Sequence, residues 1–212
     1  MKKIFTLLFA VTAFTSAHSQ FRLGVKGGLN LANSKLKVSA MGMNVAKKGD
    51  MIATYQVGLI GDVAISKGFH FRPELLLSAK GSNFDGMSID GEATTTVKFR
   101  PTYVEVPLSL VYYGEGRTVN YYIGAGPALA YGVFGKAKQG VLEDDVFQKD
   151  GFKRFDVGLN FVGGLDLKSG FTVGVNINQG LTNIMDGNQT GYNAKFNNIV
   201  YGLHVGYFFR HK

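Results

Sequence analysis

The chain has 212 residues, a formal net charge of +8, 29 glycines, 17 phenylalanines and 10 tyrosines, but no cysteine or tryptophan. The absence of cysteine excludes a disulfide framework and a lipid-modified N-terminal cysteine. No segment beyond the N-terminal region is apolar over the roughly 20 residues that a transmembrane helix needs, which excludes a helical membrane protein.

The N-terminal segment has the three-part pattern of an export signal. Lys2 and Lys3 are followed by the mainly apolar run 4–14, and small residues then stand at Ala17 and Ser19. This order is typical of a Sec signal peptide, and the run is too short for a membrane anchor. We therefore predict cleavage after Ser19, and export makes nucleic acid an improbable partner.

With residues 1–19 assigned to the signal peptide, residues 20–212 are expected to form a single domain. In residues 21–31, odd positions other than Gly27 are apolar, whereas even positions are polar or glycine. A period of two predicts a strand with one apolar and one polar face. Seven more segments alternate with varying regularity, and they are 53–65, 69–80, 102–113, 119–132, 153–168, 171–184 and 197–210.

The connections between these eight predicted strands alternate in length. Tight turns are predicted at 66–68, 114–117 and 168–170. Long polar loops are predicted at 32–52, 81–101, 133–152 and 185–196. Short turns on one rim and long loops on the other are typical of outer-membrane barrels, so we expect periplasmic turns and extracellular loops.

The period alone leaves two kinds of barrel open, because a soluble lipocalin-like barrel alternates in the same way with its apolar face inward. The glycine-rich polar face suits the crowded interior of an eight-stranded barrel. Aromatic residues near the strand ends also suit the lipid–water interface. These aromatics are Phe21, Tyr55, Phe69, Phe71, Tyr112, Tyr121, Tyr131, Phe155, Phe171, Tyr207 and Phe209. We therefore predict an all-β fold, an eight-stranded antiparallel up-and-down transmembrane β-barrel in the bacterial outer membrane.

Three prolines fall inside predicted strands. Pro73, Pro107 and Pro127 each remove a backbone donor from a ladder. A closed barrel has no edge strand to accommodate them, so we expect local β-bulges at these positions.

Several short strings occur in an order that resembles a known family. They are Gly24–Asn30, Arg72–Leu76 with Lys80-Gly81, Tyr103–Leu108, Gly124–Pro127 and Gly180–Ile184. Together they resemble the porin-like, or PorT-like, outer-membrane β-barrel domain family over nearly the whole mature chain. The resemblance implies eight strands in the outer membrane and suggests that the prolines are family features. It implies little about activity, although some relatives serve secretion or gliding machinery.

The polar face carries charges of both signs. Charges shielded from water must pair or cost several kcal/mol each, and an eight-stranded interior has room only for side chains. We therefore predict a lumen plugged by an ionic network. Its members are Arg22, Lys26, Asp62, Arg72, Glu74, Lys80, Glu105, Arg154, Asp156, Asp166 and Arg210.

No motif indicates catalysis, a cofactor or a metal. His70 and His204 lie on the polar face without an accompanying serine motif. Gly124-Ala125-Gly126 resembles part of a nucleotide-binding motif, but it lies in a predicted strand with no following helix to receive a phosphate. The segment that begins at Asp186 resembles the start of a calcium loop, but Asn197 stands at the twelfth position, where an acidic residue is required.

Lysines in the segment 32–52 indicate either a solvated loop or binding of lipopolysaccharide phosphates. They are Lys35, Lys37, Lys47 and Lys48. Membrane lipid and lipopolysaccharide are thus expected partners, and an envelope protein could dock on the long loops. We expect a structural or interaction protein that is not an enzyme; the alternatives are a narrow channel for small solutes, a lipid-modifying enzyme and a soluble ligand-binding barrel.

Overall fold

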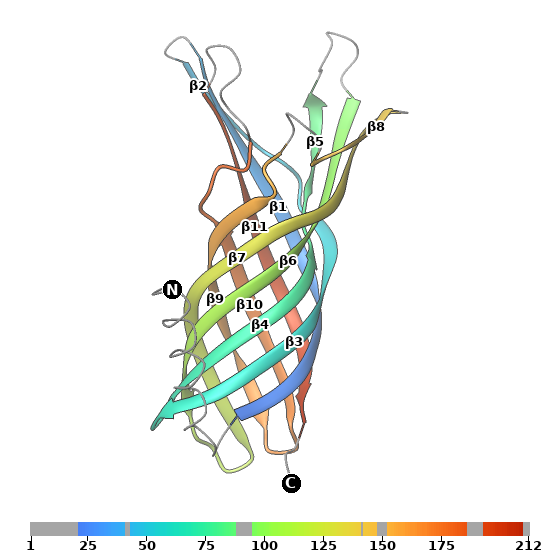
Figure 1. Cartoon of the computed structure of the whole chain (residues 1–212). Helices are drawn as coiled ribbons and strands as arrows, with labels where there is room; N and C mark the ends of the chain where they lie inside the picture. The colour runs from blue at the N-terminus through green and yellow to red at the C-terminus, as the bar shows by residue number, and fades with distance from the viewer. Residues whose placement is uncertain are drawn as a thin grey trace, which may run out of the picture.

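The computed structural model describes residues 21–40, 43–87, 95–140, 142–147, 152–185 and 193–209. Every regular element in these ranges is a β-strand (Figure 1). Within them, no helix has the length and hydrophobicity that crossing a membrane requires. The predicted signal peptide and Arg210 lie outside the described residues.

Eight antiparallel strands close in a ring, because each pairs with the next and the last pairs with the first (Figure 1). In ring order they are β1 (Phe21–Ala40), β3 (Ile52–Ser66), β4 (Phe69–Ala79), β6 (Thr95–Gly114), β7 (Val119–Gln139), β9 (Phe155–Leu167), β10 (Phe171–Gly180) and β11 (Asn193–Phe208). These correspond in order to the eight predicted segments. The turns at 67–68, 115–118 and 168–170 lie at one end, which we call the short-turn end.

Three of the segments predicted as long loops, 32–52, 81–101 and 133–152, are strand over much of their described length, which corrects that prediction for them. β1 continues to Ala40 and returns as β2 (Met43–Lys48), while β5 (Ser82–Met87) pairs with β6 and β8 (Leu142–Asp145) pairs with β7. Polar residues do not prevent strand formation here, because antiparallel pairing satisfies the backbone in each hairpin. These hairpins project from the ring opposite the short turns, at what we call the hairpin end (Figure 1).

The three prolines interrupt pairing without shifting its register. The residue pairs on either side of Pro73 share one register between β3 and β4. The β6–β7 ladder lacks pairs between Pro107 and Leu110 but keeps one register on both sides of the gap, and the β7–β9 ladder runs unbroken past Pro127. The bulges expected at these prolines are therefore absent, because a missing donor removes local hydrogen bonds but adds no residue to the strand.

A bulge does occur farther along β7. Thr102 pairs with Phe134, but the next residue of β6, Tyr103, pairs with Gly132, which leaves Val133 as an extra residue. Val133 and Phe134 are both exposed. Beyond this point the odd positions of β7 face inward instead of the even ones, since one added residue reverses the alternation.

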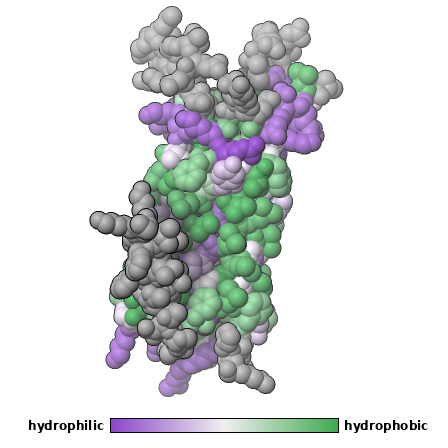
Figure 2. Space-filling model, in the orientation of Figure 1, coloured by the Kyte–Doolittle hydropathy of each residue, from purple (hydrophilic) through white to green (hydrophobic). Residues whose placement is uncertain are grey.

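The ring is apolar outside and polar inside. Its exposed apolar side chains form a broad surface between two hydrophilic rims on the face that Figure 2 shows. We call this surface the apolar band, and it includes Leu23, Val25, Leu29, Val57, Leu59, Leu75, Leu110, Ile123, Leu129, Leu159, Phe161, Val175, Ile177, Leu203 and Val205. The buried interior, the lumen, holds polar side chains that include Asn30, Gln56, Ser78, Asn160, Thr172 and Asn176.

Candidate functional site

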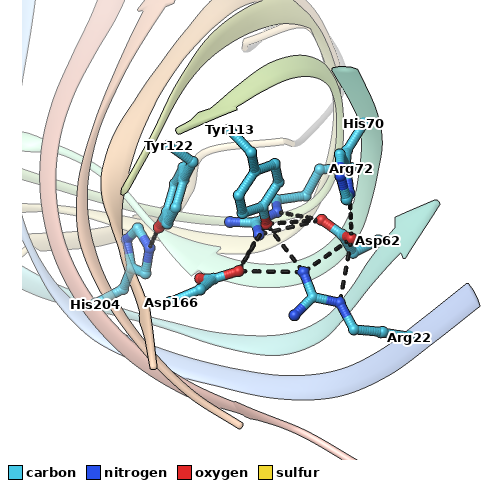
Figure 3. Close-up of polar contacts among 8 residues, drawn as sticks. All are labelled: Arg22, Asp62, His70, Arg72, Tyr113, Tyr122, Asp166 and His204. Carbon is cyan, nitrogen blue, oxygen red and sulfur yellow. Dashed lines mark hydrogen bonds and ion pairs between the residues drawn. The ribbon is translucent and has the colours of Figure 1, made fainter. Parts of the chain in front are cut away.

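Charged and hydroxyl side chains from five ring strands meet in the lumen near the short-turn end (Figure 3). We call this group the ionic cluster, and it consists of Arg22, Asp62, His70, Arg72, Tyr113 and Asp166. Asp62 lies 2.9 Å from Arg22 Nη2 and 3.2 Å from Arg72 Nη2. Asp166 lies 2.9 Å from Arg72 Nη2 and 3.2 Å from Arg22 Nη2. Each carboxylate thus contacts both guanidinium groups, and their charges balance.

Tyr113 and His70 fill the remaining sides of the two carboxylates. The Tyr113 hydroxyl lies 2.9 Å from Asp62 Oδ2 and 2.6 Å from Asp166 Oδ2. His70 Nδ1 lies 2.8 Å from Asp62 Oδ1. Such additional hydrogen bonds are what a buried ion pair needs to offset the loss of water.

Aromatic rings cover the cations of the cluster. The Arg72 guanidinium lies 4.1 Å from the centre of the Tyr122 ring, and that of Arg22 lies 4.5 Å from the centre of the Phe208 ring. Both distances permit cation–π attraction. The Tyr122 hydroxyl in turn lies 3.1 Å from His204 Nε2 (Figure 3), so the polar contacts continue across the lumen.

The middle of the lumen holds an isolated ion pair and an amide pair. Lys26 Nζ lies 2.7 Å from Glu74 Oε2, and both side chains are almost fully buried. Gln56 Nε2 donates a hydrogen bond to Asn176 Oδ1 at 2.9 Å. Glycine at position 202 makes room for this pair, because a Cβ there would lie 2.5 Å from Asn176 Oδ1.

A second buried charge group lies toward the hairpin end. Lys80 forms an ion pair with Glu105, and its Nζ lies 3.9 Å from Asp156 Oδ2. Thr182 donates a hydrogen bond to Asp156 Oδ1 at 2.6 Å. The Lys80 ammonium also lies 4.9 Å from the centre of the Tyr103 ring. This cation is therefore surrounded by acceptors and an aromatic face.

Apolar side chains fill the lumen beyond this second group. We call them the aromatic cluster, which consists of Leu36, Phe84, Phe99, Tyr103, Ala130, Val146, Phe147, Ile184 and Phe196. The ring centres of Phe99 and Phe196 lie 5.1 Å apart in an edge-to-face arrangement. The sequence reading missed this cluster. The sequence did contain an indication of it. Leu36, Phe99 and Phe196 each lie past the predicted end of a strand, at positions where the alternation of that strand points inward.

The predicted ionic network divides into these separate groups. Arg22, Asp62, Arg72 and Asp166 meet in the ionic cluster, Lys26 meets Glu74, and Lys80 meets Glu105 and Asp156. Arg154 differs, because it donates hydrogen bonds to the carbonyl oxygens of Gly132 and Phe147 and forms no ion pair with the described residues. The hydroxyl and imidazole partners of the ionic cluster were not among the predicted members.

The predicted interface aromatics lie on the outer surface of the ring. Most are exposed, whereas Phe71 and Tyr207 are partly buried. They are denser at the short-turn end, where Phe69 packs on Tyr112 at 5.3 Å between ring centres and Phe171 packs on Tyr207 at 5.0 Å. Tyr55, Tyr131 and Phe155 lie toward the hairpin end of their strands. Among the described residues, no group of three or more His, Asp or Glu side chains is arranged so that it could hold a metal ion.

The chain matches one family model in sequence. Residues 13–186 match the model described as "Outer membrane protein beta-barrel domain". No curated protein matches the chain significantly. The matched segment includes seven of the eight ring strands in full.

Solved outer-membrane barrels are similar in structure. The outer membrane protein OprG from Pseudomonas aeruginosa is 16% identical, with 92% of this chain and 99% of OprG covered and a TM-score of 0.50. Ail, the attachment invasion locus protein of Yersinia pestis, is 12% identical, with 87% and 98% covered and a TM-score of 0.40. AlkL, an outer membrane protein solved in lipid bilayers, is 13% identical, with 91% and 92% covered and a TM-score of 0.45. At these identities, the similarity to OprG bears on the fold alone.

Proposed function

Since this chain belongs to the outer membrane protein β-barrel domain family, we propose that it is an eight-stranded transmembrane barrel with a closed lumen, which anchors its hairpins at the cell surface. The short turns face the periplasm, and β2, β5 and β8 stand outside the cell with the ends of β1, β6 and β7 that pair with them. The strings described above support the narrower PorT-like assignment as part of the same proposal.

The observation that carries this proposal is a set of contacts across the lumen between strands that are not neighbours in the ring. Arg72 on β4 reaches Asp166 on β9, and Gln56 on β3 reaches Asn176 on β10. In each case at least two other strands lie between the partners, whichever way around the ring one counts. Side chains that meet from opposite walls occupy the space through which a solute would pass.

The aromatic cluster supports closure at the hairpin end. Phe147 and Ile184, which lie outside the ring strands, contribute buried side chains to it. An apolar constriction also disfavours the passage of water and ions. The lumen is thus filled by paired charges at one end and by close-packed rings at the other.

Single-channel recording in planar bilayers tests the closed lumen. We expect no steady current from the purified full chain, whereas a general porin in the same bilayer serves as the positive control. A reproducible steady conductance would overturn closure and favour the narrow channel.

The absence of native cysteine allows a clean test of orientation. A membrane-impermeant maleimide on intact cells should label Asp144→Cys in β8 and spare Glu115→Cys in a short turn. Both positions should react after the cells are lysed. Labelling of Glu115→Cys alone on intact cells would reverse the orientation.

The projecting hairpins are the proposed docking surface for an envelope protein. Strand pairing extends β1, β6 and β7 beyond the apolar band, so these hairpins present an ordered surface of paired strands. Photo-crosslinking from Asp144 in intact envelopes should capture a defined neighbour, with Glu115 as the matched control. Identical capture from both positions would contradict docking at the hairpins.

A further inference from the structure

Four lysines gather on the outer face of the hairpin end, on β1, β2 and β11. Lys35 on β1 stands directly opposite Lys48 on β2, and Lys37 on β1 stands directly opposite Lys195 on β11. All four side chains are exposed on the same face. Directly opposed like charges destabilise a sheet, so folding brings these cations together against their mutual repulsion.

Among the described residues, no acidic side chain offsets this charge at the site. A surface cavity of about 500 Å³ is lined by three of the lysines, Lys35, Lys37 and Lys48, and its other lining residues are uncharged. None of the four lysines forms an ion pair with the described part of the chain.

A second cavity on the same rim is balanced by the chain itself. This cavity of about 700 Å³ is lined by cations of β6 and β7, and also by Glu143, Asp144 and Asp145 of β8. Lys136 and Lys138 both form ion pairs with Glu143, and their hydrogen bonds lower the pKa of the Glu143 carboxyl. In contrast, the described part of the chain supplies no negative charge to the lysine site, which leaves it open to an anionic partner.

The residues that line the cavity indicate the chemistry of such a partner. The cavity also includes Ile199 and Tyr201 on β11, so cationic and apolar surfaces adjoin there. Asn33 lines the same cavity on the outward face, and its buried Oδ1 has no hydrogen-bond partner. The site therefore offers cations for phosphate, an unused acceptor for a hydroxyl group and an apolar surface for acyl chains.

We propose that Lys35, Lys37, Lys48 and Lys195 bind the phosphate groups of a phosphorylated glycolipid in the outer leaflet. The acyl chains would lie along the apolar band below Ile199 and Tyr201. This proposal rests on the orientation proposed above, which places the hairpin end beside that leaflet. It does not depend on whether the lumen is closed.

Binding of two lipids to the full chain in neutral detergent tests the proposal. The probes are a bisphosphorylated lipid A and the same lipid after removal of both phosphates, with retention measured by native mass spectrometry. We expect the phosphorylated form to bind at least about tenfold more tightly, because several basic residues act on its charge. Equal retention of the two forms would overturn the proposal.

Matched double variants locate the site. Lys37→Gln/Lys195→Gln should weaken binding of the phosphorylated lipid about tenfold, whereas Lys136→Gln/Lys138→Gln on the charge-balanced rim should leave it nearly unchanged. Equal losses in both variants would show general attraction to a basic rim and overturn the specific site. Heat-modifiable gel migration checks that each variant is folded.

Two further readouts separate the remaining outcomes. In lipid-free detergent, Lys37→Gln/Lys195→Gln should unfold at a higher temperature than the wild type, because the repulsion between the lysines is relieved. An unchanged or lower unfolding temperature would contradict uncompensated charge at the site.

Inorganic phosphate that competes as strongly as the lipid would reduce the site to a simple anion site and overturn the glycolipid assignment. If the impermeant-maleimide test reverses the orientation while lipid binding persists, the proposed topology fails and the lipid site stands.

Discussion

The two ends of the lumen are closed by different physical means. At the short-turn end, the ionic cluster joins side chains from β1, β3, β4, β6 and β9 through hydrogen bonds of defined direction. At the hairpin end, the aromatic cluster fills space through ring contacts, such as Phe84 against Phe196 at 5.8 Å between centres. The first arrangement depends on every partner being present, whereas the second depends mainly on volume.

This difference teaches where the chain tolerates change. A buried charge that loses its partner retains the full cost of its removal from water. A buried ring that is shortened loses contacts in proportion to the cavity that it leaves. We therefore expect the ionic cluster to discriminate by charge and geometry, and the aromatic cluster to discriminate by size.

The largest effect is expected for Arg72→Met in the ionic cluster. This change leaves Asp62 and Asp166 buried with one cation fewer, and it should lower the free energy of unfolding by about 3–5 kcal/mol. Urea unfolding in lipid vesicles, followed by circular dichroism, measures the change. Arg154→Met is the matched control, because Arg154 contacts carbonyl oxygens rather than carboxylates, and its loss should be clearly smaller. Equal losses would contradict the special role of charge pairing.

A smaller effect is expected for Phe196→Ala in the aromatic cluster. The cavity should lower the free energy of unfolding by about 3 kcal/mol, measured in the same vesicles. Phe196→Leu keeps most of the volume and should lose less than about 1.5 kcal/mol. If leucine were as harmful as alanine, closure at this end would depend on ring geometry and not on volume.

The smallest effect is expected where both partners of an ion pair are replaced together. Lys26→Met/Glu74→Met removes both charges of the isolated pair and should stay within about 1 kcal/mol of the wild type, whereas each single change should lose about 3 kcal/mol. The comparison of single and double variants under the same unfolding conditions measures the coupling. A double variant as unstable as the sum of the singles would show that the pair matters through packing alone.

Alternation along the sequence predicted the strands well, because a strand with one face in lipid and one in the lumen must alternate. It could not predict where that alternation reverses. Val133 and Phe134 both point outward, and a bulge set by pairing with β6 causes this. It also placed the strand ends too early, since the polar residues beyond them pair with β2, β5 and β8.

The membership of the charge groups was accessible from the sequence, but the pairing was not. Inward parity identifies Arg72 and Asp166 as lumen residues, yet their meeting depends on how β4 and β9 are staggered after the ring closes. Tyr113 also faces inward, but a tyrosine in a strand more often indicates packing or an interface than contact of its hydroxyl with two carboxylates. Arg154 is the opposite case. It was predicted to join the ionic network, but its position near the bulge directs its guanidinium to carbonyl oxygens.

The seam between β1 and β11 has a consequence for assembly. The register runs from Gly24 opposite Phe208 to Ser39 opposite Asn193, so one edge of the first ring strand can pair only after the last ring strand has been synthesised and placed. Pairing between such distant segments is slow, because most of the chain must be ordered before the contact can form. Until then two strands present unpaired edges, which are templates for pairing with other chains. Loss of β11 would therefore convert a closed ring into an open, aggregation-prone sheet.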